Sequence, residues 1–204
     1  MLAAENYQSA IELSQKCLDG FYSDRNDKFT LGQKERFYFQ SVKANRTYQY
    51  TICRYKEVRY NQKEVDADTW SQIDLMLRNT IELYSTLLHP NNNKYIYVDL
   101  IIKLMILRGY VNTQARKYIT AEKIFRQTKK VFKFVQDDYS PLINKDLRLG
   151  VPVVPFDILK QKYLLYKAIH LVCLGRTEQG LKKLLKSLNT GTIFDAKVRK
   201  ECLY

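Results

Sequence analysis

The sequence predicts an all-α protein, and three observations indicate this class. Apolar residues recur at three- and four-residue spacing through almost every segment, whereas the strict alternation of a half-buried strand is scarce. Seven Gly and four Pro are too few for a turn-rich β-sandwich. Hydrophobic residues make up 46% of the 204 residues, which is enough to form a core. A chain of this length suits one compact domain or one short helical array.

Three helices are expected in the N-terminal part of the chain. The first covers residues 6–18, where apolar side chains form one stripe. The second covers residues 32–60 and is rich in Tyr and Phe. The third covers residues 69–88, with Thr69 as its N-cap. The His89-Pro90 dipeptide ends it, because the residue before a proline is disfavoured in helical geometry.

The C-terminal part is expected to continue with helices after a less regular stretch. Helical periodicity predicts four further helices and the start of a fifth, at residues 95–114, 119–135, 156–174, 177–188 and 193–204. Residues 136–155 are the least helical segment because they contain three prolines and a glycine. They form either a loop packed on the surface or a hinge, and their aliphatic content favours packing. The sequence thus predicts N-terminal helical repeats over 1–135, a loop or hinge over 136–155, and a C-terminal hairpin with the start of a further helix over 156–204.

Two of the expected hairpins resemble tetratricopeptide repeats. The first carries the family's alternation of large and small residues at Met105, Gly109, Ala121 and Phe125. The second carries it at Leu164, Ala168, Leu171, Gly175, Gly180 and Leu184. Small residues let two antiparallel helices approach closely, and large residues fill the space between them. When the two hairpins are aligned, Arg116 takes the place of Gly175, the residue expected to supply a tight turn.

The resemblance covers about half of the chain. Residues 6–18 look like the second helix of such a repeat, but residues 32–88 fit less well. Their helices are too long, and Arg78 and Thr80 occupy positions where the family has a small and a large apolar residue. The sequence is therefore similar to a degenerate tetratricopeptide-like α-solenoid, and a generic helical bundle is the alternative.

The resemblance also implies a binding groove. In this family the first helix of each hairpin lines the concave surface. The corresponding residues are Lys103, Ile106, Tyr110, Thr113, Lys162, Leu165, Ile169 and Cys173. Chaperone-binding members hold a terminal carboxylate with a Lys/Asn clamp, which these residues do not supply. We therefore expect an apolar or aromatic groove that receives a helix or an extended peptide of a protein partner.

Catalytic, cofactor and metal-binding motifs are not found in the sequence. It contains no glycine-rich phosphate loop, no zinc-protease motif and no nucleophile elbow. His170 and Cys173 share a helix face, but their apolar surroundings favour a packed interior over a nucleophile pair. The four cysteines are far apart and form no C-x-x-C pair, so we expect small buried residues rather than ligands. We accordingly expect no enzyme, no cofactor and no metal.

The formal net charge of +13 is the strongest functional indication. It rises along the chain, from +2 over residues 1–66 to +4 over 67–138 and +7 over 139–204. The basic residues that form stripes or clusters on the expected helices are Lys123, Arg126, Lys130, Lys133, Lys182, Lys183, Lys186, Lys197, Arg199 and Lys200. An ordinary solvated helix face is the alternative explanation, but few acids interleave these residues. The pattern favours an anionic partner.

Nucleic acid is the alternative partner. Tyr48, Tyr50, Tyr55 and Tyr60 lie near basic residues, as bases stacking on aromatic rings would require. Tyrosine is also common at protein interfaces, and no RNA-binding signature accompanies these residues. We therefore favour a protein interface or a core role for them.

These observations predict a non-catalytic scaffold or adaptor that binds protein partners within a larger assembly. Its basic face would meet an acidic surface, of which the microtubule lattice is one example. The N-terminus lacks a secretory signal and no apolar run reaches about 20 residues, so we expect an intracellular, cytoplasmic protein without a membrane span. The chain starts on what looks like a second repeat helix and ends inside a first one. We therefore expect one or both ends to stack against another chain, or the protein to continue.

Overall fold

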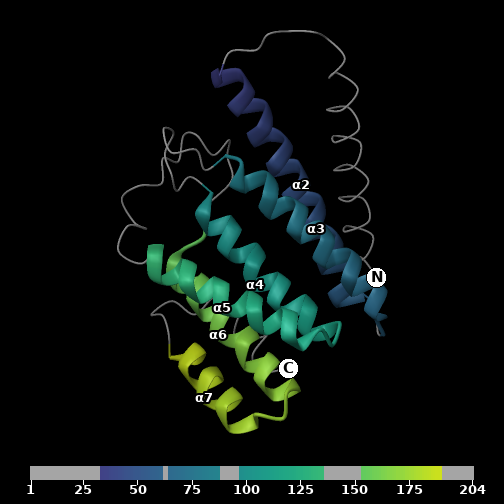
Figure 1. Ribbon diagram of the computed structural model, residues 1–204, viewed down its shortest axis with the longest axis vertical. Helices are drawn as coiled ribbons and strands as arrows, with labels where there is room; N and C mark the ends of the chain where they lie inside the picture. Colours follow the sequence, from purple (N-terminus) through teal and green to yellow (C-terminus); the bar gives the residue numbers. More distant parts are fainter. Residues whose placement is uncertain (1–32, 62–63, 88–96, 136–152, 190–204) are drawn as a thin grey trace.

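A computed structural model of the chain describes residues 33–61, 64–87, 97–135 and 153–189, with side chains from residue 38 onward. Six α-helices make up most of these residues, and none of the described residues forms a strand (Figure 1). The helices are α2 (Gln33–Asn61), α3 (Ala67–Ser85), α4 (Val98–Gln114), α5 (Tyr118–Val135), α6 (Phe156–Cys173) and α7 (Thr177–Leu188). The predicted all-α class is confirmed.

The helix bounds agree with the predicted ranges to within three residues. The third helix begins earlier than predicted because Asp66, and not Thr69, is its N-cap: the Asp66 carboxylate accepts a hydrogen bond of 2.6 Å from the backbone N–H of Thr69. The predicted helices at 6–18 and 193–204 lie outside the described residues, as does most of the predicted loop at 136–155.

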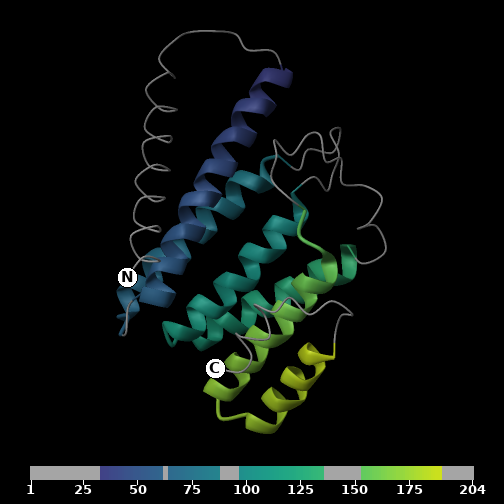
Figure 2. The same cartoon turned by 180° about the vertical axis from the view of Figure 1, so that it is seen from behind.

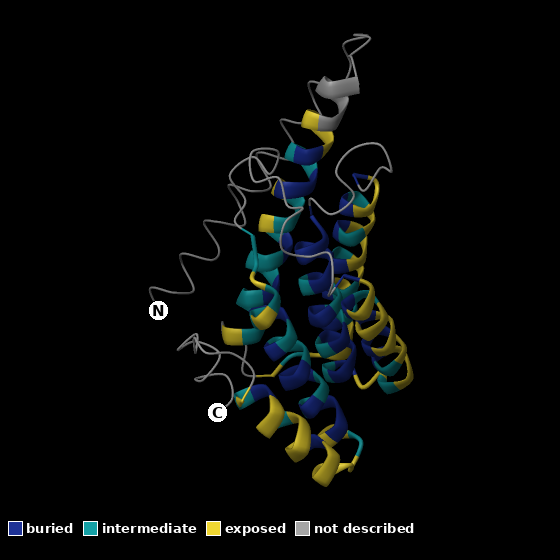
Figure 3. Cartoon of the chain, turned by 90° about the vertical axis from the view of Figure 1, so that its left-hand side faces the viewer, coloured by how far each residue is buried: buried dark blue, intermediate teal, exposed yellow. Residues whose placement is uncertain are grey.

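The helices succeed one another along the long axis of the molecule, from α2 at the upper end to α7 at the lower end (Figures 1 and 2). Helix α4 is central and packs against α3, α5 and α6. Its buried side chains include Leu100, Ile102, Leu104 and Ile106, each at most 1% exposed. Figure 3 shows this arrangement as buried residues along the middle helices and exposed residues along α7. Helix α4 therefore carries much of the core.

Polar contacts fasten the two N-terminal helices together. The Thr51 and Thr80 hydroxyls lie 3.0 Å apart between α2 and α3, and the Tyr84 hydroxyl donates to the Asn45 side chain at 2.9 Å. All four side chains are buried. Because its hydroxyl is satisfied by Thr51 and by the Met76 carbonyl, Thr80 is tolerated where the repeat pattern has a large apolar residue.

The glycine positions predicted to allow close helix packing do so. A Cβ at Gly109 would lie 2.7 Å from two ring carbons of Phe125, so α4 and α5 approach closely only because that atom is missing. A Cβ at Gly180 would lie 2.7 Å from Val172 Cγ2, across the contact of α6 with α7. The expected approaches at these two positions are thereby confirmed.

The two C-terminal hairpins share one turn geometry. Arg116 and Gly175, the residues paired by the sequence alignment, both have left-handed backbones, with φ of 57° and 75°. The next N–H in each turn bonds to a carbonyl five residues back: Lys117 to Asn112 at 2.8 Å, and Arg176 to Leu171 at 2.9 Å. Both turns are Schellman motifs, which satisfy the last carbonyls of a helix.

Candidate functional site

The predicted groove residues are placed mostly in contacts between helices. Ile106, Thr113 and Leu165 are only 1%, 2% and 2% exposed, because α4 and α6 pack directly against each other. A partner cannot reach these three side chains, and the structure corrects that part of the predicted groove.

The remaining groove residues are divided between partly buried and exposed positions. Lys103 donates a hydrogen bond to the Tyr48 hydroxyl of α2. Tyr110 packs against Trp70 and Tyr166, with ring centroids 6.2 and 4.7 Å apart. The others are Lys162 and Ile169, which are half-buried, and Cys173, which is exposed. These residues do not combine into one open groove.

The predicted basic residues instead meet at a different place, a cleft bounded by α5, α6 and α7. It has a volume of about 610 Å³, within the range of ligand-binding pockets. Its lining residues are Glu122, Phe125, Arg126, Lys129, Phe132, Lys133, Phe156, Lys160, Tyr163, Leu164, Lys167, Leu171, Arg176, Gln179, Lys183 and Lys186. We refer to it as the basic cleft.

The basic cleft collects part of the predicted basic face. Four predicted residues line it: Arg126, Lys133, Lys183 and Lys186. Three others, Lys123, Lys130 and Lys182, are exposed on the same helices outside the lining, and Lys197, Arg199 and Lys200 lie outside the described residues. Residues from two distant segments of the sequence thus form the two walls of one cleft.

Sequence reasoning did not single out four further cations of the cleft. These are Lys129, Lys160, Lys167 and Arg176. The seven-residue spacing of Lys160 and Lys167, which places both on one face of α6, was the available signal. Among the described lining residues, eight are Lys or Arg and Glu122 is the sole carboxylate. Such an excess of one sign inside a concave surface attracts anions.

Aromatic rings form the floor of the basic cleft. The Phe132 ring packs edge-to-face against Phe156 and Tyr163, with ring centroids 5.2 and 5.5 Å apart. Tyr163 donates its hydroxyl to the Phe125 carbonyl at 3.3 Å, which turns the polar end of the side chain away from solvent. Burial and the nearby Glu122 carboxylate raise the pKa of Tyr163 to about 12. The floor is therefore apolar and uncharged at neutral pH.

Glu122 connects the end of the cleft to the protein interior. Its carboxylate accepts hydrogen bonds from Lys167 and from Arg126, the latter at 3.2 Å, and lies 3.2 Å from His170 Nε2. Burial opposes its charged form, but Lys167, Arg126 and His170 outweigh that effect, and the pKa of Glu122 is lowered. Burial and the neighbouring Lys167 lower the pKa of His170. The charged groups at this end of the cleft are thus paired with one another within the protein.

The histidine and cysteine predictions have different outcomes. His170 is fully buried, which confirms its predicted place in a packed interior. Cys173 is exposed and Cys53 is half-buried, so the prediction of small buried residues is wrong for Cys173. Residue 173 is the last of α6. Cys17 and Cys202 lie outside the described residues.

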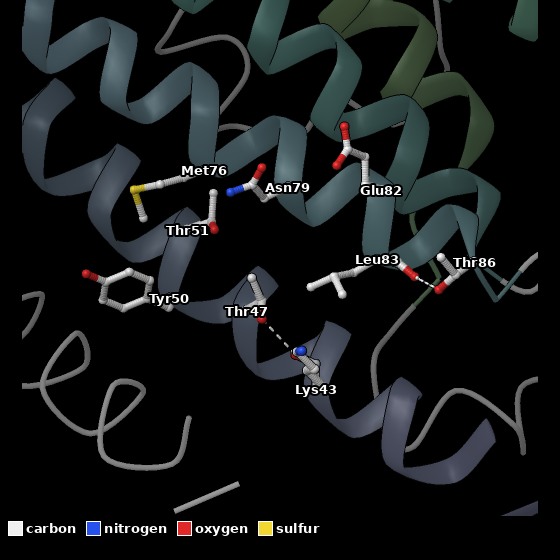
Figure 4. A pocket seen from close by; sticks show the side chains of 9 residues that line it. All are labelled: Lys43, Thr47, Tyr50, Thr51, Met76, Asn79, Glu82, Leu83 and Thr86. Carbon is white, nitrogen blue, oxygen red and sulfur yellow. Dashed lines mark hydrogen bonds between the residues drawn. The ribbon is translucent and has the colours of Figure 1, made fainter. Parts of the chain in front are cut away.

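A second pocket lies between α2 and α3 (Figure 4). Its volume is about 440 Å³, and its lining is Lys43, Thr47, Tyr50, Thr51, Met76, Asn79, Glu82, Leu83 and Thr86. One lysine and one glutamate line it, so it lacks the single charge sign of the basic cleft. Its walls mix apolar and short polar side chains, and it offers no comparable chemistry.

The tyrosines considered for base stacking lie on α2, away from the basic cleft. Tyr55 is 4% exposed, and its hydroxyl accepts a hydrogen bond from Arg59 at 2.8 Å. Tyr48 packs against Tyr84 with ring centroids 6.1 Å apart. Tyr50 is half-buried, and Tyr60 is 48% exposed. Of these four rings only Tyr60 is exposed, and the Arg59 guanidinium lies over it, 5.2 Å from the ring centroid.

Comparison with protein-family models, with curated proteins and with solved structures finds no match to this chain. The tetratricopeptide-like resemblance consequently stays a prediction. Within the described ranges, no helix is long and apolar enough to span a bilayer. The same residues contain no group of three or more His, Cys, Asp or Glu side chains that could hold a metal ion.

Proposed function

We propose that this protein is a non-catalytic scaffold or adaptor that binds an anionic macromolecular partner in the basic cleft. One observation carries the proposal: eight cationic side chains from α5, α6, α7 and the α6–α7 turn converge on a concave site to which Glu122 adds the one carboxylate of the described lining. Cations kept for solubility alone are usually mixed with acids and spread over the surface. Converging charges instead raise the local concentration of an oppositely charged ligand.

A tetratricopeptide-like stack is the proposed framework. The matching turns at Arg116 and Gly175 support it, as do the close approaches at Gly109 and Gly180. In such a stack each helix pair is held by its neighbours, and the surfaces between pairs are available to partners. The cleft lies at one of these places, since α5 belongs to one hairpin and α6 and α7 belong to the next.

An acidic protein surface is the proposed partner within a larger assembly. The acidic tails on a microtubule are one surface of this kind. Nucleic acid is the competing partner, because phosphates would also satisfy the cations. The α2 tyrosines do not support it, because Tyr55 is buried and the others lie on a helix that does not line the cleft.

Charge reversal on both walls tests the proposal. The double variant Lys129→Glu, Lys183→Glu removes one cation from α5 and one from α7. The control Lys123→Glu, Lys182→Glu changes the net charge equally at exposed positions of the same helices outside the lining. Binding of a fluorescent polyglutamate peptide and of a single-stranded oligonucleotide is measured by anisotropy over a salt series.

We expect the cleft variant to weaken polyglutamate binding by about tenfold or more, which corresponds to ~1.4 kcal/mol. The control is expected to change the affinity much less, because its charges lie outside the cleft. An equal loss in both variants would show that net charge alone attracts the ligand. Absence of any binding at low salt would also overturn the proposal.

A further inference from the structure

The basic cleft combines two features that a purely anionic ligand would not use together. Its walls are cationic, but its floor consists of the rings of Phe132, Phe156 and Tyr163 together with Leu164 and Leu171. Phe156 and Tyr163 are half-buried and keep part of their surface at the cleft. A ligand made only of phosphates or carboxylates would leave this apolar surface in contact with water. The floor therefore selects a ligand that also carries apolar groups.

Six wall residues, five of them cationic, are spaced along their helices in matching rows. Arg126, Lys129 and Lys133 line the cleft from α5, and Gln179, Lys183 and Lys186 line it from α7. Each row spans seven residues, or roughly 10 Å at ~1.5 Å per residue of helix. Two parallel rows of this length on either side of an apolar floor complement about two turns of an amphipathic helix with acidic flanks.

The ring geometry disfavours nucleic acid as the occupant. Base stacking needs an open ring face. Phe125 is fully buried and Phe132 is only 8% exposed. The Tyr163 ring makes edge-to-face contacts with Phe125 and with Phe132, at centroid separations of 6.0 and 5.5 Å. Neighbouring rings thus cover much of these aromatic surfaces, which leaves little open ring face on which a base could stack.

Charge is distributed unevenly along the cleft. At the end formed by the start of α5, Glu122 is already bonded to Lys167 and Arg126. At the other end Lys133, Lys160 and Lys186 line the cleft. The lining carboxylate is thus engaged within the protein at one end of the cleft.

We infer that the occupant of the basic cleft is an acidic amphipathic segment of a partner protein. Its apolar side chains rest on the aromatic floor and its carboxylates meet the two rows of cations. This inference depends on the proposed function and adds the chemistry of the partner. Two copies of this chain joined through their clefts are disfavoured, because the cationic walls would face each other.

Three probes of equal charge test the inference on the full chain. The first is a peptide with leucines at three- and four-residue spacing flanked by glutamates. The second is the same peptide with alanine in place of leucine, and the third is a single-stranded oligonucleotide. The leucine peptide is expected to bind at least about tenfold tighter than the alanine peptide, and more of its affinity is expected to survive high salt.

Truncating an aromatic side chain of the cleft floor is the change on the protein that matches the leucine-to-alanine change on the peptide. Phe156→Ala is expected to weaken the leucine peptide by about tenfold and the alanine peptide much less, with circular dichroism as the folding control. Because the peptide comparison needs no variant, the inference stays testable even if this variant unfolds.

The outcomes separate the inference from the proposed function. If the two peptides bound with equal affinity and both lost binding in the double variant Lys129→Glu, Lys183→Glu, the apolar requirement would be overturned. The anion-binding cleft would still be supported by this result. Tighter binding of the oligonucleotide than of the leucine peptide would also overturn the inference. Binding that does not depend on Lys129 and Lys183 would remove both conclusions.

Discussion

His170 lies between two helices with a hydrogen-bonding group at each ring nitrogen. Nδ1 is 3.0 Å from the Thr113 hydroxyl, and Nε2 is 3.2 Å from the Glu122 carboxylate. The same hydroxyl lies 2.9 Å from the Gly109 carbonyl oxygen. Its one hydrogen cannot serve both Gly109 and His170. A neutral ring has one N–H and one lone pair, so only the protonated ring can donate to both Thr113 and Glu122.

Stability is expected to fall as the pH drops from about 7 to 5.5. Because burial and Lys167 lower the pKa of His170, the unfolded chain takes up this proton first, near its ordinary pKa of ~6.5. Glu122, whose pKa is also lowered, adds a loss only at pH values below ~4.5. Urea unfolding at several pH values measures this, with His170→Gln as the control. A wild-type slope between pH 7 and 5.5 no steeper than that of His170→Gln would contradict the assignment.

Gly109 tests how tightly α4 and α5 pack. Alanine is the better helix former by about 1 kcal/mol, but its Cβ would lie 2.7 Å from two carbons of the fully buried Phe125 ring. We expect Gly109→Ala to destabilise the fold by about 1–3 kcal/mol in chemical denaturation, because overpacking outweighs propensity. Gly180→Ala is the comparison. Its near neighbour Val172 is 48% exposed and can rotate, so a smaller loss is expected. Equal effects would contradict this explanation.

At the scale of the elements, Arg59 joins α2 to α4 and α6. Its guanidinium donates to the hydroxyls of Tyr55 and Tyr166 at 2.8 and 2.6 Å. It also lies 5.0 Å from the Tyr110 ring centroid and 5.2 Å from that of Tyr60. Cation–π contacts of this kind are favourable, and they combine here with two hydrogen bonds. One side chain therefore fastens the C-terminal end of α2 to the helices below it.

Removing this guanidinium is expected to loosen α2. In Arg59→Met the buried hydroxyls of Tyr55 and Tyr166 lose their donor, which we expect to cost about 2 kcal/mol. Arg46→Met is the control on the same helix, since Arg46 is exposed and its guanidinium donates to the nearby Gln49 side chain, one turn along α2. Thermal unfolding compares the two variants. Similar midpoints would contradict a fastening role for Arg59.

At the scale of the whole molecule, α4 connects the N-terminal and C-terminal helices. It packs against α3, α5 and α6, and the buried Asp99 carboxylate near its start accepts a hydrogen bond of 2.8 Å from the Val154 backbone N–H. Damage to α4 should therefore spread to both ends of the described structure. The groove prediction implied the opposite, because residues that line an open groove can be substituted without destabilising the fold.

Ile106→Ala distinguishes a core residue from a groove residue. We expect a loss of about 2–5 kcal/mol, because truncating a side chain only 1% exposed leaves a cavity. Hydrogen exchange is expected to quicken in both α3 and α6. Ile119→Ala, at a position 77% exposed on α5, is the control and should change stability by less than about 0.5 kcal/mol. Unchanged stability of Ile106→Ala would restore the groove assignment.

Local patterns predicted the helices well, but they did not predict which helix faces stay exposed. Periodicity and the turn residues near Arg116 and Gly175 indicated α4 to α7, because such signals lie within a few neighbouring residues. Which helix face stays open depends on neighbours far away in sequence. Thr113 and Leu165 are covered by an α4–α6 contact that no local pattern encodes. The same holds for the cleft, whose walls come from α5 and α7.

The proposed binding role of the basic cleft can be examined by thermal shift. A segment bound between α5 and α7 would touch two hairpins at once and act as an additional brace. A ligand that binds the folded state alone raises the unfolding free energy by about 2.7 kcal/mol at a hundredfold excess over its dissociation constant. A library of unlabelled acidic peptides can accordingly be screened by melting temperature, before the partner itself has been identified. In Lys129→Glu, Lys183→Glu, any peptide acting through the cleft should lose its effect.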